Sequence, residues 1–256
     1  MTDLHIFAQK AGYRDTEWER DGGKYGWGNN RGLVLMKSFD LVNWTRANVH
    51  FDEISREYGD VGCVWAPETI YDEAAGKLMI YFTMRFGNEP NRLYYAYVND
   101  NFNRLESRPA LLFEYPDKTT TAIDGDITRV GDTYRLFYVA HEGTPGIKQA
   151  VSRDINRGFA FSPKWIDPEP NACEAPTVWK RIGEDRWVLM YDCYGLKKHN
   201  FGFVETSDFE TFTPIGRFNE GRMKATNFSS PKHGAVVHIT TEEADRLERF
   251  WKTGRP

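Results

Sequence analysis

The sequence predicts an all-β fold, a five-bladed β-propeller, from two observations. The first is a pattern that recurs four times, in "SFDLVNW" (38–44), "VNDNFNRL" (98–105), "SRDINRGF" (152–159) and "TSDFETF" (206–212). Its aspartates are spaced by 60, 54 and 54 residues: Asp40, Asp100, Asp154 and Asp208. The second is that short β-prone runs separated by turns fill the chain, without convincing helical periodicity before residue 240. Units of three or four short strands at such an interval are typical of propeller blades. A β-sandwich is the structural alternative, although it does not require an even period.

Three segments repeat a strand, a tight turn and a second strand: "WAPETIYDEAAGKLMIYFT" (65–83), "DGDITRVGDTYRLFYVA" (124–140) and "EAPTVWKRIGEDRWVLMYD" (174–192). A third strand follows each of them, in "RLYYAYV", "GIKQAVS" and "NFGFVET". Each segment therefore begins with the innermost strand of one blade. Acidic residues stand at the head of the second and third segments, Asp124 with Asp126 and then Glu174, in positions otherwise suited to a core strand.

The two ends of the chain predict incomplete blades. "DLHIFAQKA" and "GLVLMKSFDLVNW" supply later strands of a first blade, whose innermost strand we expect to precede residue 1. "KHGAVVHI" (232–239) supplies an innermost strand, which we expect to close the ring beside "DLHIFAQKA". Thr240 and Glu243 form a capping box for a C-terminal helix over 240–252, which we interpret as a lid on a single domain, 1–256.

The composition limits the classes of function. Of the 256 residues, 40% are hydrophobic and 15% aromatic, which is ample for a core. A net charge of −4 with interspersed signs argues against a nucleic-acid surface. No apolar run approaches the roughly 20 residues of a membrane span, and no secretory signal is recognisable. We therefore expect a cytoplasmic protein or a mature or truncated secreted form. Three cysteines without zinc-like spacing predict buried small hydrophobes: Cys63, Cys173 and Cys193.

Five motifs in order carry a family resemblance: "SFDLVNW", "WAPETIYD", "IDGDI", "CEAP" and "KHGAVVHI". They resemble the S-x-D-L-x-N-W, W-A-P-[DE], I-D-P-S, E-G-P and late His-Gly motifs of glycoside hydrolase family 43, and they span nearly the whole chain. The resemblance implies a five-bladed propeller with three acidic residues at its central funnel. It also implies inverting hydrolysis of arabinofuranosyl, xylosyl or galactosyl linkages in glycans derived from plant polysaccharides.

The resemblance assigns catalytic roles to Glu174 and Asp124. Glu174 matches the general acid of E-G-P, with Ala175 in place of the family's glycine, and we expect its pKa to be raised. Asp124 matches the residue that positions the acid, with Asp126 as a competitor in "IDGD". A strand-end ion pair for Glu174 and an Asx turn for Asp124 are the structural alternatives. No residue matches the general base: Asp3, Asp15 and Asp60 lack its motif.

Four further residues are candidates for substrate binding. Trp65 heads an innermost strand and could stack on a sugar or lie in the core, whereas Arg85 and His141 follow second strands and could donate hydrogen bonds or remain solvated. His233 matches a late histidine at the axis, where some relatives hold calcium through water. No cofactor is required, and calcium near His233 is the one ion that the resemblance allows. A Gly-rich insertion could flank the pocket through three aromatic residues: Trp18, Tyr25 and Trp27.

The leading hypothesis is therefore a glycosidase whose partner is an oligo- or polysaccharide, with neither nucleic acid nor membrane. The alternative is a noncatalytic carbohydrate-binding propeller that lacks the base. A sucrose-type fructosidase is disfavoured, because its N-terminal nucleophile is not seen. We expect weak hydrolysis at best, and self-association through unpaired strand edges.

Overall fold

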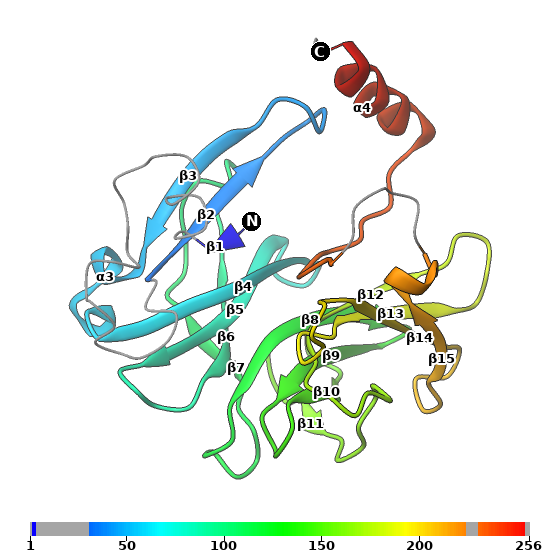
Figure 1. The fold of residues 1–256 in the computed structure, drawn as a ribbon. Helices are drawn as coiled ribbons and strands as arrows, with labels where there is room; N and C mark the ends of the chain where they lie inside the picture. The colour runs from blue at the N-terminus through cyan, green and yellow to red at the C-terminus, as the bar shows by residue number, and fades with distance from the viewer. Residues whose placement is uncertain (1, 4–30, 224–229, 254–256) are drawn as a thin grey trace.

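The computed structural model describes residues 2–3, 31–223 and 230–253, which form four antiparallel sheets and a few short helices (Figure 1). The sheets follow one another in chain order around a common centre (Figure 1). Strand β8 packs there between β4 and β12, so the first strands of three successive sheets converge. The all-β prediction is confirmed. The described residues form four sheets, and they do not include a closed ring of five.

The strands fall in the predicted units, but β4 and β8 begin at Val61 and Ala122, before the predicted starts at Trp65 and Asp124. The first sheet contains β1 (Thr2–Asp3), β2 (Gly32–Lys37) and β3 (Thr45–His50). The second contains β4 (Val61–Asp72), β5 (Lys77–Phe86), β6 (Arg92–Tyr97) and β7 (Ala110–Phe113). The third contains β8 (Ala122–Val130), β9 (Thr133–Ala140), β10 (Gly146–Ser152) and β11 (Ala160–Phe161). The fourth contains β12 (Glu174–Lys180), β13 (Trp187–Asp192), β14 (Phe201–Thr206) and β15 (Thr213–Arg217). The three predicted strand–turn–strand segments are β4–β5, β8–β9 and β12–β13.

Helices are short and peripheral in the described part of the chain. They are α3 (Phe51–Ile54), the 3₁₀ turns η1 (Arg56–Tyr58) and η2 (Phe218–Glu220), and α4 (Thr241–Thr253). No helix in the described ranges is long and apolar enough to cross a membrane.

The second strands of the second and third sheets are apolar on both faces, because each face meets a neighbouring sheet. In β5, Ile80 and Phe82 pack toward the first sheet, whereas Met79 and Tyr81 pack toward the third. Strand β9 continues this alternation toward the second and fourth sheets. This is why these strands read as unbroken hydrophobic runs rather than as an alternation of polar and apolar residues.

Among the described residues, no further sheet covers the far face of the fourth sheet. Its core cluster consists of residues from this sheet and η2 alone: Val188, Met190, Phe201, Phe203 and Phe218. The segment 231–236 runs over part of this face and leaves a cavity of about 480 Å³ beside it. A Cβ on Gly234 would lie 3.4 Å from Phe201 Cζ, so the segment approaches the sheet closely.

The four repeated aspartates lie in the turn before the last strand of their sheets, as the repeat predicts. Asp40 and Asp208 make the same turn, in which the carboxylate accepts from backbone N–H groups two and three residues later at 2.7–2.9 Å. Asp100 and Asp154 do not: in the second sheet the side chain of Asn99 accepts from backbone N–H groups four and five residues later, and Asp154 pairs with Arg157. The repeat is therefore confirmed in position, and the bonding pattern in two turns of the four.

The C-terminal predictions are partly wrong. The capping box is confirmed, because Thr240 Oγ1 accepts from Glu243 N at 3.2 Å and Glu243 Oε2 accepts from Thr240 N at 2.7 Å. However, 231–240 forms no strand and does not pair with β1, which pairs with β2 alone among the described strands. None of the described strands pairs with this β-prone run, which has no regular secondary structure. The described part of "DLHIFAQKA" is limited to Asp3.

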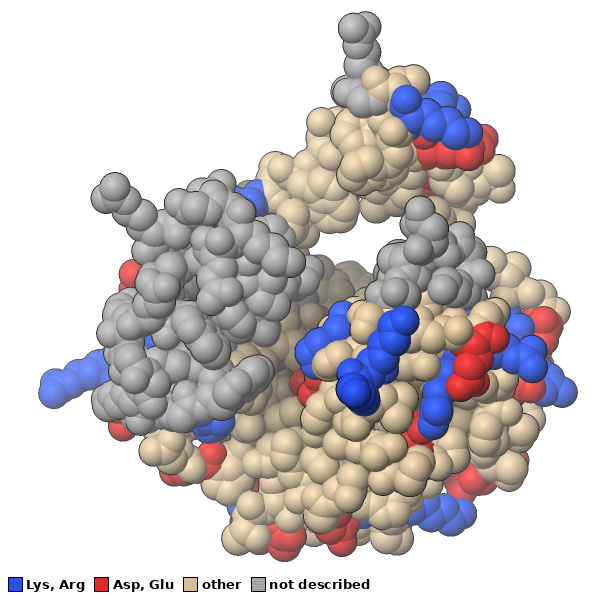
Figure 2. Space-filling view, in the orientation of Figure 1, with Lys and Arg blue, Asp and Glu red and all other residues tan. Residues whose placement is uncertain are grey.

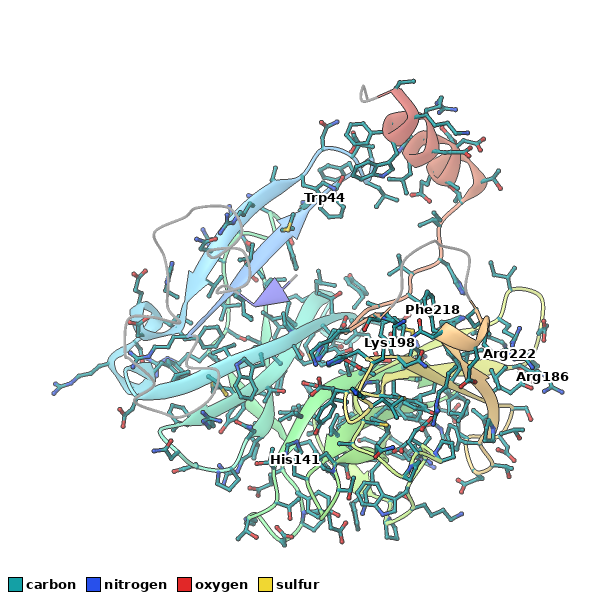
Figure 3. The ribbon with its side chains drawn as sticks, viewed as in Figure 1. Trp44, His141, Arg186, Lys198, Phe218 and Arg222 are labelled. Atoms are coloured by element: carbon teal, nitrogen blue, oxygen red, sulfur yellow. The ribbon has the colours of Figure 1, made fainter. Side chains whose placement is uncertain are left out.

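Helix α4 is not a lid, because none of its residues is buried. In the space-filling view an opening separates it from the lower part of the molecule (Figure 2). Arg246 donates to the carbonyl of Asp40 at 3.3 Å, so the helix meets the β2–β3 turn, where Trp44 lies on the facing side (Figure 3). The three cysteines are buried and free, as expected.

Candidate active site

The site is built on irregularities at the same point of three innermost strands. Strands β4, β8 and β12 each contain a β-bulge, at which the pairing with the next strand shifts register after Trp65, Ile123 and Glu174. The next residue in each case has a left-handed backbone: Ala66 (φ 45°), Asp124 (φ 53°) and Ala175 (φ 50°). His233 has the same conformation (φ 48°) in the segment 231–240. Non-glycine residues rarely adopt it, and bulges re-aim side chains, so this recurrence indicates a functional site.

The bulges bring Asp124, Glu174 and His233 together. One donor atom from each residue lies within 4.8 Å of the other two. Of the two aspartates in "IDGD", Asp124 is the one placed beside Glu174. The structure therefore unites three of the predicted site residues at the common centre of the sheets.

Asp124 is held from both neighbouring sheets. Its backbone N–H donates to Thr83 Oγ1 of β5 at 3.0 Å, and its Oδ2 accepts from Ala175 N of β12 at 3.1 Å. Burial raises the pKa of Asp124 to about 6. The charge of His233 lowers this pKa, and the nearby Glu174 carboxylate raises it. Asp124 therefore retains a proton at mildly acidic pH, where ordinary aspartates are ionised.

Glu174 is held by two basic residues at the start of the C-terminal segment. Lys232 Nζ lies 2.5 Å from Glu174 Oε1, and His233 Nε2 lies 2.9 Å from the same oxygen. Burial raises the pKa of Glu174, but the hydrogen bonds from His233 and Lys232 outweigh it and lower the pKa to about 2. The expectation of a raised pKa for Glu174 is wrong for this arrangement. The structural alternative, a strand-end ion pair for Glu174, is present in the structure, and the partner Lys232 itself lies in the site.

Lys232 is the residue that the sequence reasoning missed. It precedes His233 as Glu174 precedes Ala175, so its position relative to the left-handed residue matches that of Glu174. Its Nζ also lies 3.5 Å from Asp192 Oδ2, and 5.5 Å from the ring centre of Tyr194. The signal was present in "KHG", where a lysine adjoins the motif histidine.

A second acidic pair lies two residues farther along the strands. Asp126 Oδ2 accepts from Val178 N at 2.6 Å. Burial and the charge of Glu68 raise the pKa of Asp126 to about 8, and burial also raises the pKa of Glu68. Asp126 and Glu68 each lie two residues after a left-handed residue, Asp124 in β8 and Ala66 in β4, so acidic residues occupy two successive levels of these strands.

The softer candidates lie around this centre. Trp65 and Arg85 pack together, with the guanidinium carbon 5.3 Å from the tryptophan ring centre. Arg85 lies within β5 rather than in a solvated loop. His141 directly follows β9 and is exposed as a whole. Partial burial of its imidazole lowers the pKa of His141, while the charge of Glu174 acts in the opposite direction. Asp60 lies in an exposed turn before β4. Four candidates lie outside the described residues: Asp15, Trp18, Tyr25 and Trp27.

Direct coordination of calcium does not fit the described side chains. Asp124, Glu174 and His233 could converge on a cation. Calcium, however, prefers six to eight oxygen ligands, and an imidazole nitrogen is a poor substitute. The Lys232 ammonium also contacts Glu174 already. A calcium ion near His233 would therefore have to be held through water, which remains a prediction.

The fold is therefore all-β, with successive four-stranded sheets whose innermost strands carry carboxylates at a common centre. The family model of the family 43-related proteins, described as "Probable glycosyl hydrolase domain", matches residues 1–245, and the chain belongs to this family. No curated protein matches the chain.

Solved structures support the fold. A thermostable family-43 glycoside hydrolase is 20% identical with a TM-score of 0.60, covering 81% of this chain and 72% of its own. The Bacillus subtilis arabinanase is 19% identical with a TM-score of 0.58, covering 83% and 79%. The catalytic domain of a Coprinopsis cinerea GH62 alpha-L-arabinofuranosidase is 15% identical with a TM-score of 0.52, covering 73% and 63%.

Proposed function

We propose that this protein is an inverting glycoside hydrolase that acts on arabinofuranosyl, xylosyl or galactosyl linkages of glycans derived from plant polysaccharides. The observation that carries the proposal is the convergence of Asp124, Glu174 and His233 at the bulges of successive innermost segments. The names of the arabinanase and arabinofuranosidase among the similar structures favour pentose units.

In this proposal Glu174 is the general acid and Asp124 positions it and tunes its proton affinity. Their carboxyl oxygens lie within 4.8 Å of each other. The acid and base of an inverting enzyme are about 6.5–9.5 Å apart, with a sugar and a water between them. The two residues therefore act on the same side of the substrate, and the base is a different residue, which we do not assign.

Proton donation requires Glu174 to exchange its ionic partners. With Lys232 and His233 bound it is ionised, and the proton of the coupled pair resides on Asp124 at mildly acidic pH. A glycosidic oxygen arriving at Glu174 Oε1 would displace the Lys232 ammonium, whose side chain is 49% exposed and would retain its contact with Asp192. Loss of that contact raises the proton affinity of Glu174, as an acid catalyst requires.

We further propose that the sheets belong to a five-bladed ring. The left-handed residues of β4, β8, β12 and the His233 segment would mark four of its innermost positions. In the first sheet, Asp40 lies between β2 and β3, which corresponds to the turn between the third and fourth strands elsewhere. Strand β1 packs against β4 as the second strand β5 packs against β8. The fifth innermost position would belong to the first blade.

The test of the acid is Glu174→Gln, assayed with aryl arabinofuranosides and xylosides whose leaving groups differ in basicity. General acid catalysis contributes about 10²–10⁴-fold, so we expect a loss of that size with basic leaving groups. The matched control is Glu106→Gln, which removes an exposed carboxylate paired with Lys77 at the rim. Parental rates in Glu174→Gln would show that Glu174 is not the acid. NMR of the first-formed anomer tests inversion.

A noncatalytic carbohydrate-binding propeller is the second candidate. The neutralisation of Glu174 by Lys232 and the unassigned base favour it. Sugar binding measured by calorimetry, without hydrolysis of any aryl glycoside or arabino-oligosaccharide, would establish the binding module. Full hydrolysis by the 256-residue chain would instead show that it contains its own base, and that our expectation of weak activity is wrong.

A further inference from the structure

Asp192 is a buried carboxylate beside the site that the proposed mechanism does not use. It is the last residue of β13, has no exposed surface, and is the direct cross-strand neighbour of Glu174 in β12. Opposed residues in neighbouring strands have closely spaced side chains, and two like charges there are unfavourable. The pair persists because cations lie over it.

The contacts of Asp192 lead to the two residues that hold Glu174. Its Oδ2 accepts from the backbone N–H of His233 at 3.3 Å and lies 3.5 Å from Lys232 Nζ. Lys232 and His233 in turn reach Glu174 Oε1 at 2.5 and 2.9 Å. One oxygen of Asp192 therefore holds both the backbone of His233 and the ammonium of Lys232.

A carboxylate at this position is costly for the fold. Asp192 Oδ1 is buried and has no hydrogen-bond partner among the described residues, and burial raises the pKa of Asp192. A buried polar atom without a partner costs about 1–3 kcal/mol. The neighbouring rows of the same sheet face carry Met190 and Phe203, so an apolar residue would suit this surface. An ionisable group that the fold itself does not favour indicates a role in the site.

We propose that Asp192 is a positioning residue of the reaction, which orients the Glu174 carboxyl through Lys232 and His233. The segment 231–236 has no strand pairing, so its place over β12 and β13 depends on side-chain contacts such as these. Asp192 therefore decides where the two cations stand relative to Glu174. This inference rests on the proposed function, in which Glu174 is the acid.

The first test is Asp192→Asn, which keeps the shape and an acceptor for His233 N but removes the charge. A misplaced general acid lowers the rate most for substrates with basic leaving groups, because activated leaving groups need little protonation. We expect kcat to fall about tenfold or more for an alkyl glycoside, and less than about threefold for the 2,4-dinitrophenyl glycoside. Asp72→Asn is the matched control, because Asp72 is also buried and accepts from Tyr97 at 2.5 Å, far along β4 from the site. Equal losses with both substrates in Asp192→Asn would overturn the proposal.

The second test needs no turnover. Asp192→Asn and Glu174→Gln are combined, and the midpoints of thermal unfolding of the single and double variants are compared. The two carboxylates repel each other directly as cross-strand neighbours, whereas their shared contacts with Lys232 and His233 couple them favourably. We expect a net favourable coupling that becomes weaker or unfavourable when Lys232→Met is added, because the direct repulsion remains. Additive shifts would overturn the positioning role, whereas an inactive parent chain with preserved coupling would overturn only the proposed hydrolysis.

Discussion

Replacing Lys232 by methionine removes one of the two cations that hold Glu174 while keeping a side chain of similar length. The ammonium lies 2.5 Å from Glu174 Oε1, and the Glu174 side chain is 17% exposed. We expect Lys232→Met to raise the pKa of Glu174 from about 2 toward its ordinary value. The variant should therefore lose stability at neutral pH and gain proton affinity at the proposed acid.

The magnitude follows from the lowered pKa. A shift from 4.5 to about 2 corresponds to roughly 3 kcal/mol of stability, shared between His233 and Lys232. Because the folded pKa is lowered, this contribution is present above the unfolded pKa and is lost as pH falls through the folded pKa. We therefore expect Lys232→Met to cost about 1–2 kcal/mol at pH 7, in line with one charge-assisted hydrogen bond. The difference from the parent should shrink below pH 4 and approach zero near pH 2.

The assay is urea unfolding of parent and variant at pH 7, 5, 4 and 3. Lys77→Met is the control, because Lys77 makes an ion pair of 2.8 Å with Glu106 on the exposed rim, where such a pair is worth about 0–1 kcal/mol. The same pH dependence in the parent and in Lys232→Met would refute the reasoning. A loss equal to that of Lys77→Met would also refute it.

Three further predictions concern the centre of the sheets. Burial raises the pKa of Asp126 to about 8, so ionisation of Asp126 destabilises the folded protein as the pH rises from 4 to 8. Asp126→Asn should therefore stabilise the protein by up to about 4 kcal/mol at pH 7 and have no effect on stability at pH 3, as measured by urea unfolding. A Cβ on Gly125 would lie 2.9 Å from Leu93 Cδ1, so Gly125→Ala should lower the melting temperature at a cost of about 1–3 kcal/mol, and an unchanged temperature would mean that the leucine yields freely. Hydrolysis, where present, should survive EDTA, and loss of activity restored by calcium would contradict the expectation that no metal is required.

The repeat and the motifs sufficed to predict the three complete sheets, because their signals are local. Turn residues, β-prone runs and the doubly apolar second strands such as β5 appear in order along the chain. The bulge residues were visible as "WAP", "IDG" and "EAP", so Asp124 and Glu174 could be placed on neighbouring innermost strands before any coordinates were known. Convergence of these strands at one centre then brings their side chains together.

The same local reasoning failed for "KHGAVVHI". Its residues favour a strand, but a strand forms only where it can pair with a partner edge, and none of the described strands pairs with 231–240. The lid expectation for α4 failed for a related reason. An amphipathic pattern predicts a helix, but it does not identify the surface on which the apolar side will rest.

The protonation state of the site was decided by the tertiary structure alone. The sequence identified Glu174 as an acid with Asp124 as its neighbour and placed His233 near the axis, but Lys232 lies 58 positions from Glu174 in the chain. Charges act through distance in space, and a contact of 2.5 Å outweighs the burial that would otherwise raise the pKa of Glu174. Sequence therefore determined which carboxylates meet at the centre, because the repeat fixes their strands. The fold determined which of them is ionised, because only packing sets how close each cation approaches.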